Sequence, residues 1–302
     1  MLDPSDATER HCMRPRPLHR KLLLPLAAAL LAAPGFALAG PAAPTPKPAS
    51  AAAPGAAGAQ SKSQAAAPAP PRKATADERA MAERLDPLAR AAFWAHEIQV
   101  DPRDAQAGVR LAASLRALGR NDEAVTAAEQ VLVVDPANRD ALLESARGHL
   151  AAGQGFYAIA PLEKLKSLDP RDWRYVSLLG VAYQQVSRDA DAEAAWRQAL
   201  QMSPDNPAIL SNLAMHYAAR GQGSEAERLL RQAAAQPGST LQVRQNLALV
   251  LGLEGKLSEA EQFERQDLPP ELADANMAYL RAASSAPGAL AAAGKVGPGA
   301  VR

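Results

Sequence analysis

A spacing of 34 residues recurs along the chain and constrains its fold more than any other feature. Alanine fills one position of this repeat at Ala124, Ala158, Ala192, Ala226 and Ala260. Glycine, or serine once, fills a second position at Gly119, Gly153, Ser187, Gly221 and Gly255. Such a period is typical of helical repeat arrays, because one pair of helices cannot bury its own apolar face and stacked neighbours complete the core. The sequence therefore predicts an all-α solenoid.

The residues at other repeating positions mark where helices begin and end. The series expected to cap the first helix of each repeat, by accepting backbone N–H groups, is Asp104, Asn138, Asp172, Asn206 and Thr240. The glycine series ends this helix, since glycine readily adopts a left-handed conformation. Prolines end the second helix, because the residue before a proline is pushed out of the helical conformation. We expect five helix pairs, at 105–138, 139–172, 173–206, 207–240 and 241–272.

Further helices are expected at both ends of the repeats. Residues 75–100, which include Phe93 and Trp94, are predicted to form an N-terminal helical cap. Residues 270–284 are predicted to form a C-terminal capping helix. The predicted solenoid therefore covers residues 74–284.

The start of the chain has the order of a secretory signal peptide, predicted over residues 1–39. A basic stretch at 14–21 precedes an apolar stretch at 22–33, and small residues that a signal peptidase reads follow. The apolar stretch is shorter than the about 20 residues of a membrane span, and an uncleaved N-terminal anchor is the alternative. A start at Met13 would shorten the signal by residues 1–12.

Two segments are too poor in large apolar side chains to fold alone. Residues 40–73 are rich in Ala, Pro, Gly, Ser and Lys, and residues 285–302 are rich in Ala and Gly. Such segments cannot bury enough surface to offset their chain entropy. We predict a disordered linker at 40–73 and a disordered tail at 285–302.

Composition and motifs argue against catalysis and nucleic-acid binding. The formal net charge is +1, without the basic excess that phosphate contacts require. The single cysteine, Cys12, precedes the predicted cleavage site. His149 occupies the repeat position of Tyr183 and Tyr217, and His216 has no partner at metal-ligand spacing. We therefore predict no catalytic residues, no metal site and no cofactor, and expect protein or peptide segments as partners.

The pattern through residues 104–272 resembles the tetratricopeptide repeat. The resemblance implies a superhelix in which positions two, five, nine and twelve of each first helix line a concave groove. The groove candidates are Gln106, Val109, Arg116, Leu143, Arg147, Arg174, Val181, Gln184, Ser211, Met215, Gln245 and Leu249. This mixture of apolar side chains, arginines and glutamines would suit an extended segment or a helix. The alternative is that these are ordinary solvated side chains.

A chaperone-type clamp for C-terminal carboxylates is a specialisation of such grooves, and the sequence argues against it. Asn212 fits the pattern of that clamp. The positions that should carry its other Lys, Arg and Asn residues instead hold Ser177, Val181, Gln242 and Asn246.

A narrower resemblance lies in Asn246–Ala283, which reads NLALVLGLEGKLSEAEQFERQDLPPELADANMAYLRAA. This segment is similar to the terminal repeat and cap of the TadD family of Flp (tight adherence) pilus assembly proteins. The family implies a periplasm-facing accessory protein, generally an outer-membrane lipoprotein, that assists the secretin and pilus machinery. Leu38-Ala39-Gly40 is followed by Pro41 where a lipoprotein needs cysteine. We therefore expect a soluble periplasmic form, associated with membrane only through partners or an uncleaved anchor.

The sequence leaves two scaffold functions open. One is assembly of a Flp/Tad-type pilus or secretion apparatus. The other is a periplasmic adaptor for cytochrome maturation, or for peptidoglycan or polysaccharide export machinery.

Overall fold

The computed structural model describes residues 72–285, which contain thirteen α-helices and no strand. The helices are α1 Ala76–Ala82, α2 Pro87–Val100, α3 Ala105–Ala117, α4 Asn121–Val134, α5 Arg139–Ala151, α6 Gly155–Leu168, α7 Trp173–Gln185, α8 Asp189–Met202, α9 Pro207–Ala219, α10 Gly223–Ala234, α11 Leu241–Leu253, α12 Leu257–Asp267 and α13 Pro270–Ser284. The predicted all-α repeat array is confirmed. The predicted signal peptide, nearly all of the predicted linker and nearly all of the predicted tail lie outside the described residues.

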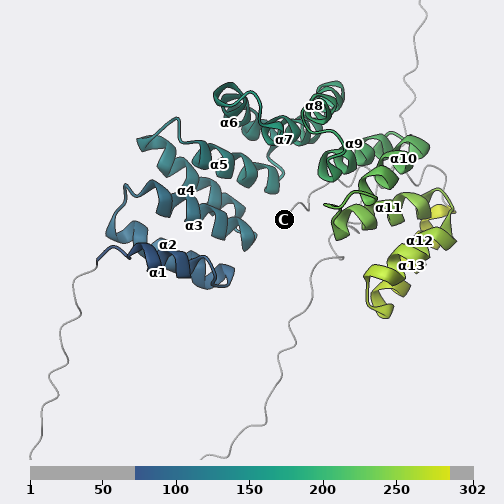
Figure 1. Ribbon diagram of the computed structural model, residues 1–302, viewed down its shortest axis with the longest axis horizontal. Coiled ribbons are helices and arrows are strands. Elements are labelled where there is room, and N and C mark those ends of the chain that lie inside the picture. The colour runs from purple at the N-terminus through teal and green to yellow at the C-terminus, as the bar shows by residue number, and fades with distance from the viewer. Residues whose placement is uncertain (1–71, 286–302) are drawn as a thin grey trace, which may run out of the picture. The chain divides into compact units, whose positions relative to one another are not determined.

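Consecutive helices pack against each other along the array (Figure 1). The repeats are the pairs α3–α4, α5–α6, α7–α8, α9–α10 and α11–α12. First helices of successive repeats also pack together: α3 contacts α5, and α9 contacts α11. The last helix, α13, packs on both α11 and α12. In the described part of the chain, no helix combines the length and apolarity needed to cross a membrane.

The two helices of a repeat begin differently. Each predicted cap residue accepts a backbone N–H at the start of its first helix, as Asp104 does from Ala107 at 3.0 Å. The second helices α4, α6, α8, α10 and α12 begin without a side-chain cap bond. The chain instead enters them through a residue with positive φ, glycine in four repeats and Ser187 (φ 59°) in the third. The turn geometry thus sets where each second helix starts.

Small residues bring the helices of the array close together. All five alanines of the repeating series on the second helices are fully buried. In the third repeat Gly180 lies against Trp196, whose indole is fully buried and donates from Nε1 to the Ser177 carbonyl at 3.1 Å. One continuous apolar core runs from α5 to α13, and two smaller clusters lie among α1 to α4. This packing fixes the first helices side by side.

Candidate functional site

The twelve groove candidates all lie on first helices, and together they are called the first-helix face. Ten of them are exposed or half-buried. Val181 and Ser211 are buried, so they offer little surface to a ligand. The apolar members Leu143, Met215 and Leu249 pack partly against the main core. Their exposed portions remain beside the polar members of the face.

An ion cluster joins the first two repeats on this face. The carboxylate of Glu144 is only 6% exposed and accepts from two arginines. Arg116 of α3 donates its Nε to Oε2 at 2.9 Å, and Arg147 of α5 donates its Nη1 to Oε1 at 2.9 Å. One carboxylate therefore faces two guanidinium groups, which leaves an excess of positive charge.

Both arginines retain hydrogen-bonding capacity. A guanidinium carries five N–H donors, and among the described residues each of the two makes one hydrogen bond. The side chains are 23% exposed for Arg116 and 36% exposed for Arg147. They can therefore donate to carbonyl or carboxylate oxygens of a bound segment while Glu144 holds them in place.

Arg174, the third arginine of the face, is arranged differently. It is tied to Asp172, the cap of its own helix, through Nε at 2.9 Å and Nη2 at 2.5 Å. Hydrogen bonds from Arg174 lower the pKa of Asp172 below its ordinary value. The carboxylate and the guanidinium neutralise each other, so Arg174 contributes less positive charge to the face.

The C-terminal part of the face is neutral. The Ser211 hydroxyl accepts from the Asn246 side-chain amide at 2.9 Å, which links α9 to α11. Within the described chain, Oε1 of Gln184 and Nε2 of Gln245 are covered and have no hydrogen-bond partner. The face thus grades from arginines in the first repeats to amides and apolar groups in the last ones.

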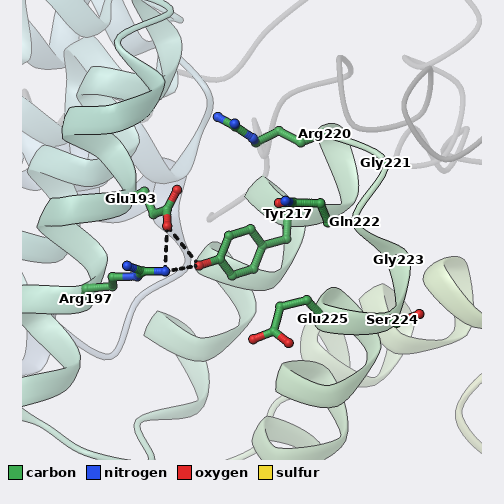
Figure 2. Close-up of a pocket in the computed structure, with 9 residues that line it drawn as sticks. All are labelled: Glu193, Arg197, Tyr217, Arg220, Gly221, Gln222, Gly223, Ser224 and Glu225. Atoms are coloured by element: carbon green, nitrogen blue, oxygen red, sulfur yellow. Dashed lines mark hydrogen bonds and ion pairs between the residues drawn. The ribbon is translucent and has the colours of Figure 1, made fainter.

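A polar pocket of about 560 Å³ lies between α8 and the turn that joins α9 to α10 (Figure 2). Tyr217 donates its hydroxyl to Glu193 at 3.0 Å and accepts from Arg197 at 2.9 Å. Arg197 and Glu193 are also paired at 2.8 Å. The three groups satisfy one another in a closed triangle, which fits a structural link between repeats.

This triangle was not predicted from the sequence, because Tyr217 was expected to be a packing residue. Glu193 and Arg197 are four residues apart on one helix, a spacing at which opposite charges meet. The sequence could therefore have predicted the ion pair between Glu193 and Arg197. The contact with Tyr217 of the next repeat depends on how the repeats stack, which spacing alone does not give.

The sequence from residue 190 to residue 250 matches a family model described as tetratricopeptide repeat. A solved tetratricopeptide-repeat protein of Thermus thermophilus is 27% identical with a TM-score of 0.53, over 58% of this chain and 98% of that one. Residues 190–250 thus match the tetratricopeptide-repeat family, and the described helices share the fold of solved tetratricopeptide-repeat proteins. One from Parabacteroides merdae is 11% identical with a TM-score of 0.59, over 68% of this chain and 85% of that one. No curated protein matches the sequence.

MamA from Desulfovibrio magneticus is a further solved structure with some likeness to this chain. It is 20% identical with a TM-score of 0.47, over 53% of this chain and 95% of that one. That likeness is too distant to inform function. The resemblance of residues 246–283 to the TadD family is not shown by these matches and stays a prediction.

The histidines of the repeats are placed for packing. His216 is buried between Trp196 and Tyr217, with ring centroids 5.5 Å and 5.9 Å away. Burial lowers its pKa below the ordinary value. His149 stacks near Tyr157, with ring centroids 5.5 Å apart. Residues 72–285 hold no group of three or more His, Cys, Asp or Glu side chains arranged for a metal ion.

Proposed function

We propose that this protein binds polypeptide segments along its first-helix face and acts as a non-catalytic scaffold in the bacterial envelope. The observation that carries the proposal is the cluster of Arg116, Glu144 and Arg147. A buried carboxylate there orients two guanidinium groups whose remaining N–H donors have no partner among the described residues. Positioned donors of this kind suit the carbonyl and carboxylate oxygens of a polypeptide.

The neutral part of the face supports the same proposal. Met215 and Leu249 offer apolar contact. The other amide atoms, Nε2 of Gln184 and Oε1 of Gln245, can donate to a carbonyl and accept from an N–H of a peptide bond. An extended segment would place acidic side chains or backbone carbonyls at the arginines, and its apolar side chains on α9 and α11. Tetratricopeptide repeats are typically scaffolds for other proteins, which fits this arrangement.

Assembly of a Flp/Tad-type pilus or secretion apparatus is the process we propose for the scaffold. The support is the secretory order of residues 1–39 and the likeness of residues 246–283 to the TadD family. An adaptor role in cytochrome maturation, or in peptidoglycan or polysaccharide export, is the alternative. A secretin, a secretion ATPase and a prepilin encoded nearby would favour the pilus; haem-ligation or glycan genes would favour the alternative.

Gene deletion with complementation tests the proposal. We expect deletion to abolish surface Flp pili and to leave general envelope integrity intact, and the wild-type gene to restore the pili. The informative variant replaces Arg116, Glu144 and Arg147 by Gln together, because it removes the charges and leaves no buried carboxylate without a partner. This variant should fail to restore pili.

The matched control is Arg228→Gln, which alters an exposed, paired arginine of the second helix α10, outside the first-helix face. We expect it to restore pili. Normal piliation in the deletion strain would exclude the pilus role. Full complementation by the triple variant would show that the ion cluster does not bind the partner.

A further inference from the structure

A second cavity, of about 500 Å³, lies at the N-terminal end of the array, between α1, α2 and the start of α3. This volume is within the range of about 300–1,000 Å³ that binding pockets usually have. Its lining includes Glu83 after α1, Trp94 of α2 and Gln106 of α3. Gln106 is also a member of the first-helix face, so the cavity adjoins that face.

The wall of the cavity is held in place by a buried ion network. Glu97 is 1% exposed and accepts from Arg79 Nε at 3.0 Å and from the Ala74 backbone N–H at 3.1 Å. Arg79 also donates to Asp104 at 2.6 Å and to Gln106 at 3.0 Å. Four of the five N–H donors of Arg79 are engaged, and its charge faces two carboxylates, so it does not call for an anionic ligand.

The other cations of the wall are compensated as well. Lys73 pairs with Asp101 at 2.5 Å and lies 3.6 Å from Asp104. Arg110 lies 3.5 Å from Glu83. Each positive charge of the wall faces a carboxylate, so an anion entering the cavity would find no unpaired cation.

Two lining groups lack a hydrogen bond, in contrast to the network around them. Trp94 is 1% exposed, and its indole N–H has no acceptor within the residues that the structure describes. Oε1 of Glu83 is covered and receives no hydrogen bond there, although Arg110 Nε lies 3.5 Å away as its ion-pair partner. A covered polar group without a partner costs about 1–3 kcal/mol. The equivalent atom of Trp196 is bonded to Ser177, so this is not a general property of the chain's tryptophans.

We infer that this end cavity binds a peptide bond of the partner polypeptide, whose carbonyl oxygen accepts from Trp94 Nε1–H and whose N–H donates to Glu83 Oε1. One missing acceptor and one missing donor are what an amide supplies, and the paired cations disfavour an anion. Since both atoms are covered, a wall side chain must turn to admit the ligand. Arg110, which lines the cavity and has a side chain 49% exposed, is placed to do so, and its turning would uncover Glu83 Oε1. The inference rests on the proposed function and assigns one end of the bound segment to this cavity.

Nuclear magnetic resonance of the indole N–H groups tests the inference. The chain has three tryptophans, so the isotope-labelled full chain should give three indole signals, and Trp94→Phe identifies that of Trp94. The probe is tetra-alanine with an acetyl and an N-methylamide cap, which offers peptide bonds and no charge. We expect the Trp94 signal to move downfield as probe is added, and that of Trp196 to stay in place.

A Glu83→Leu variant removes the proposed acceptor while keeping Trp94 as the reporter. It should weaken probe binding by about tenfold or more, the effect of losing about 1.4 kcal/mol. A circular dichroism melt checks that the variant is folded; if it is not, Glu83→Gln, which keeps an acceptor, should bind the probe almost normally. A Trp94 signal that stays unmoved at about 20 mM probe, far above a millimolar Kd, would overturn the inference, as would equal movement of all three signals.

The test is separable from that of the proposed function. Cross-linking of a partner to the first-helix face reports the proposed function without involving Trp94 or Glu83. If such cross-links form and the Trp94 signal does not shift with the probe, only the assignment of the end cavity is wrong. If the Trp94 signal responds and no partner cross-links to the face, the proposed function is wrong.

Discussion

The second repeat, residues 139–172, and the third, residues 173–206, fill the same two core positions in different ways. The second repeat has Ala146 on its first helix and Leu162 on its second, and both are fully buried. The third has Gly180 and Trp196, and a Cβ built on Gly180 would lie 2.5 Å from the Trp196 indole nitrogen. The larger residue on the second helix of the third repeat is therefore matched by a smaller one on its first helix, since close packing leaves no room for both Trp196 and a Cβ at position 180.

The turns and faces of the two repeats differ as well. Gly153 has φ 73° with no atom within 4 Å of an added Cβ, whereas Ser187 adopts φ 59° with a side chain. Arg147 shares a buried carboxylate with Arg116, whereas Arg174 is paired with its own cap residue. The third repeat thus carries a strained turn and a neutralised arginine where the second has a relaxed turn and an open cluster.

Exchanging the core pair should give the largest effect. Gly180→Ala forces Cβ into the indole and should cost about 1–3 kcal/mol of unfolding free energy. Trp196→Leu leaves a cavity and should cost about 2–4 kcal/mol. The double variant recreates the pair of the second repeat, so its cost should be smaller than the sum by about 1 kcal/mol or more. Urea denaturation of the four proteins measures this, and strictly additive losses would refute the pairing.

Glu144→Leu tests the ion cluster, because leucine is the residue of the third repeat at this position, Leu178. The variant removes the acceptor that two arginines share. The arginines are partly exposed and can turn toward water, so we expect a loss of about 1–2 kcal/mol. The Arg116→Gln, Glu144→Gln, Arg147→Gln variant should lose less, since it leaves no unpaired charge. Urea denaturation that ranks the two in the opposite order would contradict this account of the cluster.

Ser187→Gly should stabilise the protein. A left-handed conformation costs a residue with a side chain about 1–2 kcal/mol, and the greater freedom of glycine in the unfolded chain returns about 0.5–1 kcal/mol of that. We expect a net gain of about 0.5–1 kcal/mol. Gly153→Ser, the reverse change in the second repeat, should lose a similar amount. Thermal melts of both variants decide the point, and a matching sign for the two would exclude strain at Ser187 as the cause.

The smallest effect concerns His216, which packs on the Trp196 that only the third repeat carries. Burial lowers the pKa of His216 below its unfolded value of about 6.5. In the window between the folded pKa and about 6.5 the unfolded state binds more protons, so stability falls as pH falls through it. The nearby Asp189 and Glu193 oppose this shift, and Arg220 adds to it.

His216→Gln should therefore flatten the stability profile between about pH 7.5 and pH 5.5, a range above the ordinary carboxyl pKa values. We expect this difference in the free energy of unfolding to be the smallest of those predicted here. Replacing the exposed His96 by Gln is the control and should leave the profile unchanged. Urea midpoints across this range provide the measurement. Parallel profiles for wild type and His216→Gln would contradict the assignment.

Spacing predicted the repeats well because caps, turn glycines and close-packed alanines act within one repeat. The side-chain bonds of Asp104 and Thr240 at their helix starts follow from residue type and position alone. Contacts between repeats were harder to foresee. Glu144 was not predicted as the partner of Arg116, and Val181 was predicted on an open face but is buried, because both depend on how neighbouring repeats stack.

The end cavity escaped prediction for a similar reason. Trp94 was expected only to help form a cap, and its missing acceptor is visible once α1, α2 and α3 are placed together. Sequence patterns show which residues can bond, whereas the packed helices show which of them remain unsatisfied.

Site-specific photo-cross-linking in living cells tests the central claim most directly. A photoreactive amino acid would replace Leu143 or Leu249 on the first-helix face, and Gln130 or Gln198 on exposed positions of second helices as matched controls. The account predicts cross-linked partner bands from Leu143 and Leu249 and none from Gln130 and Gln198. Bands from the second-helix positions alone would contradict it, because the partner would then bind away from the first helices.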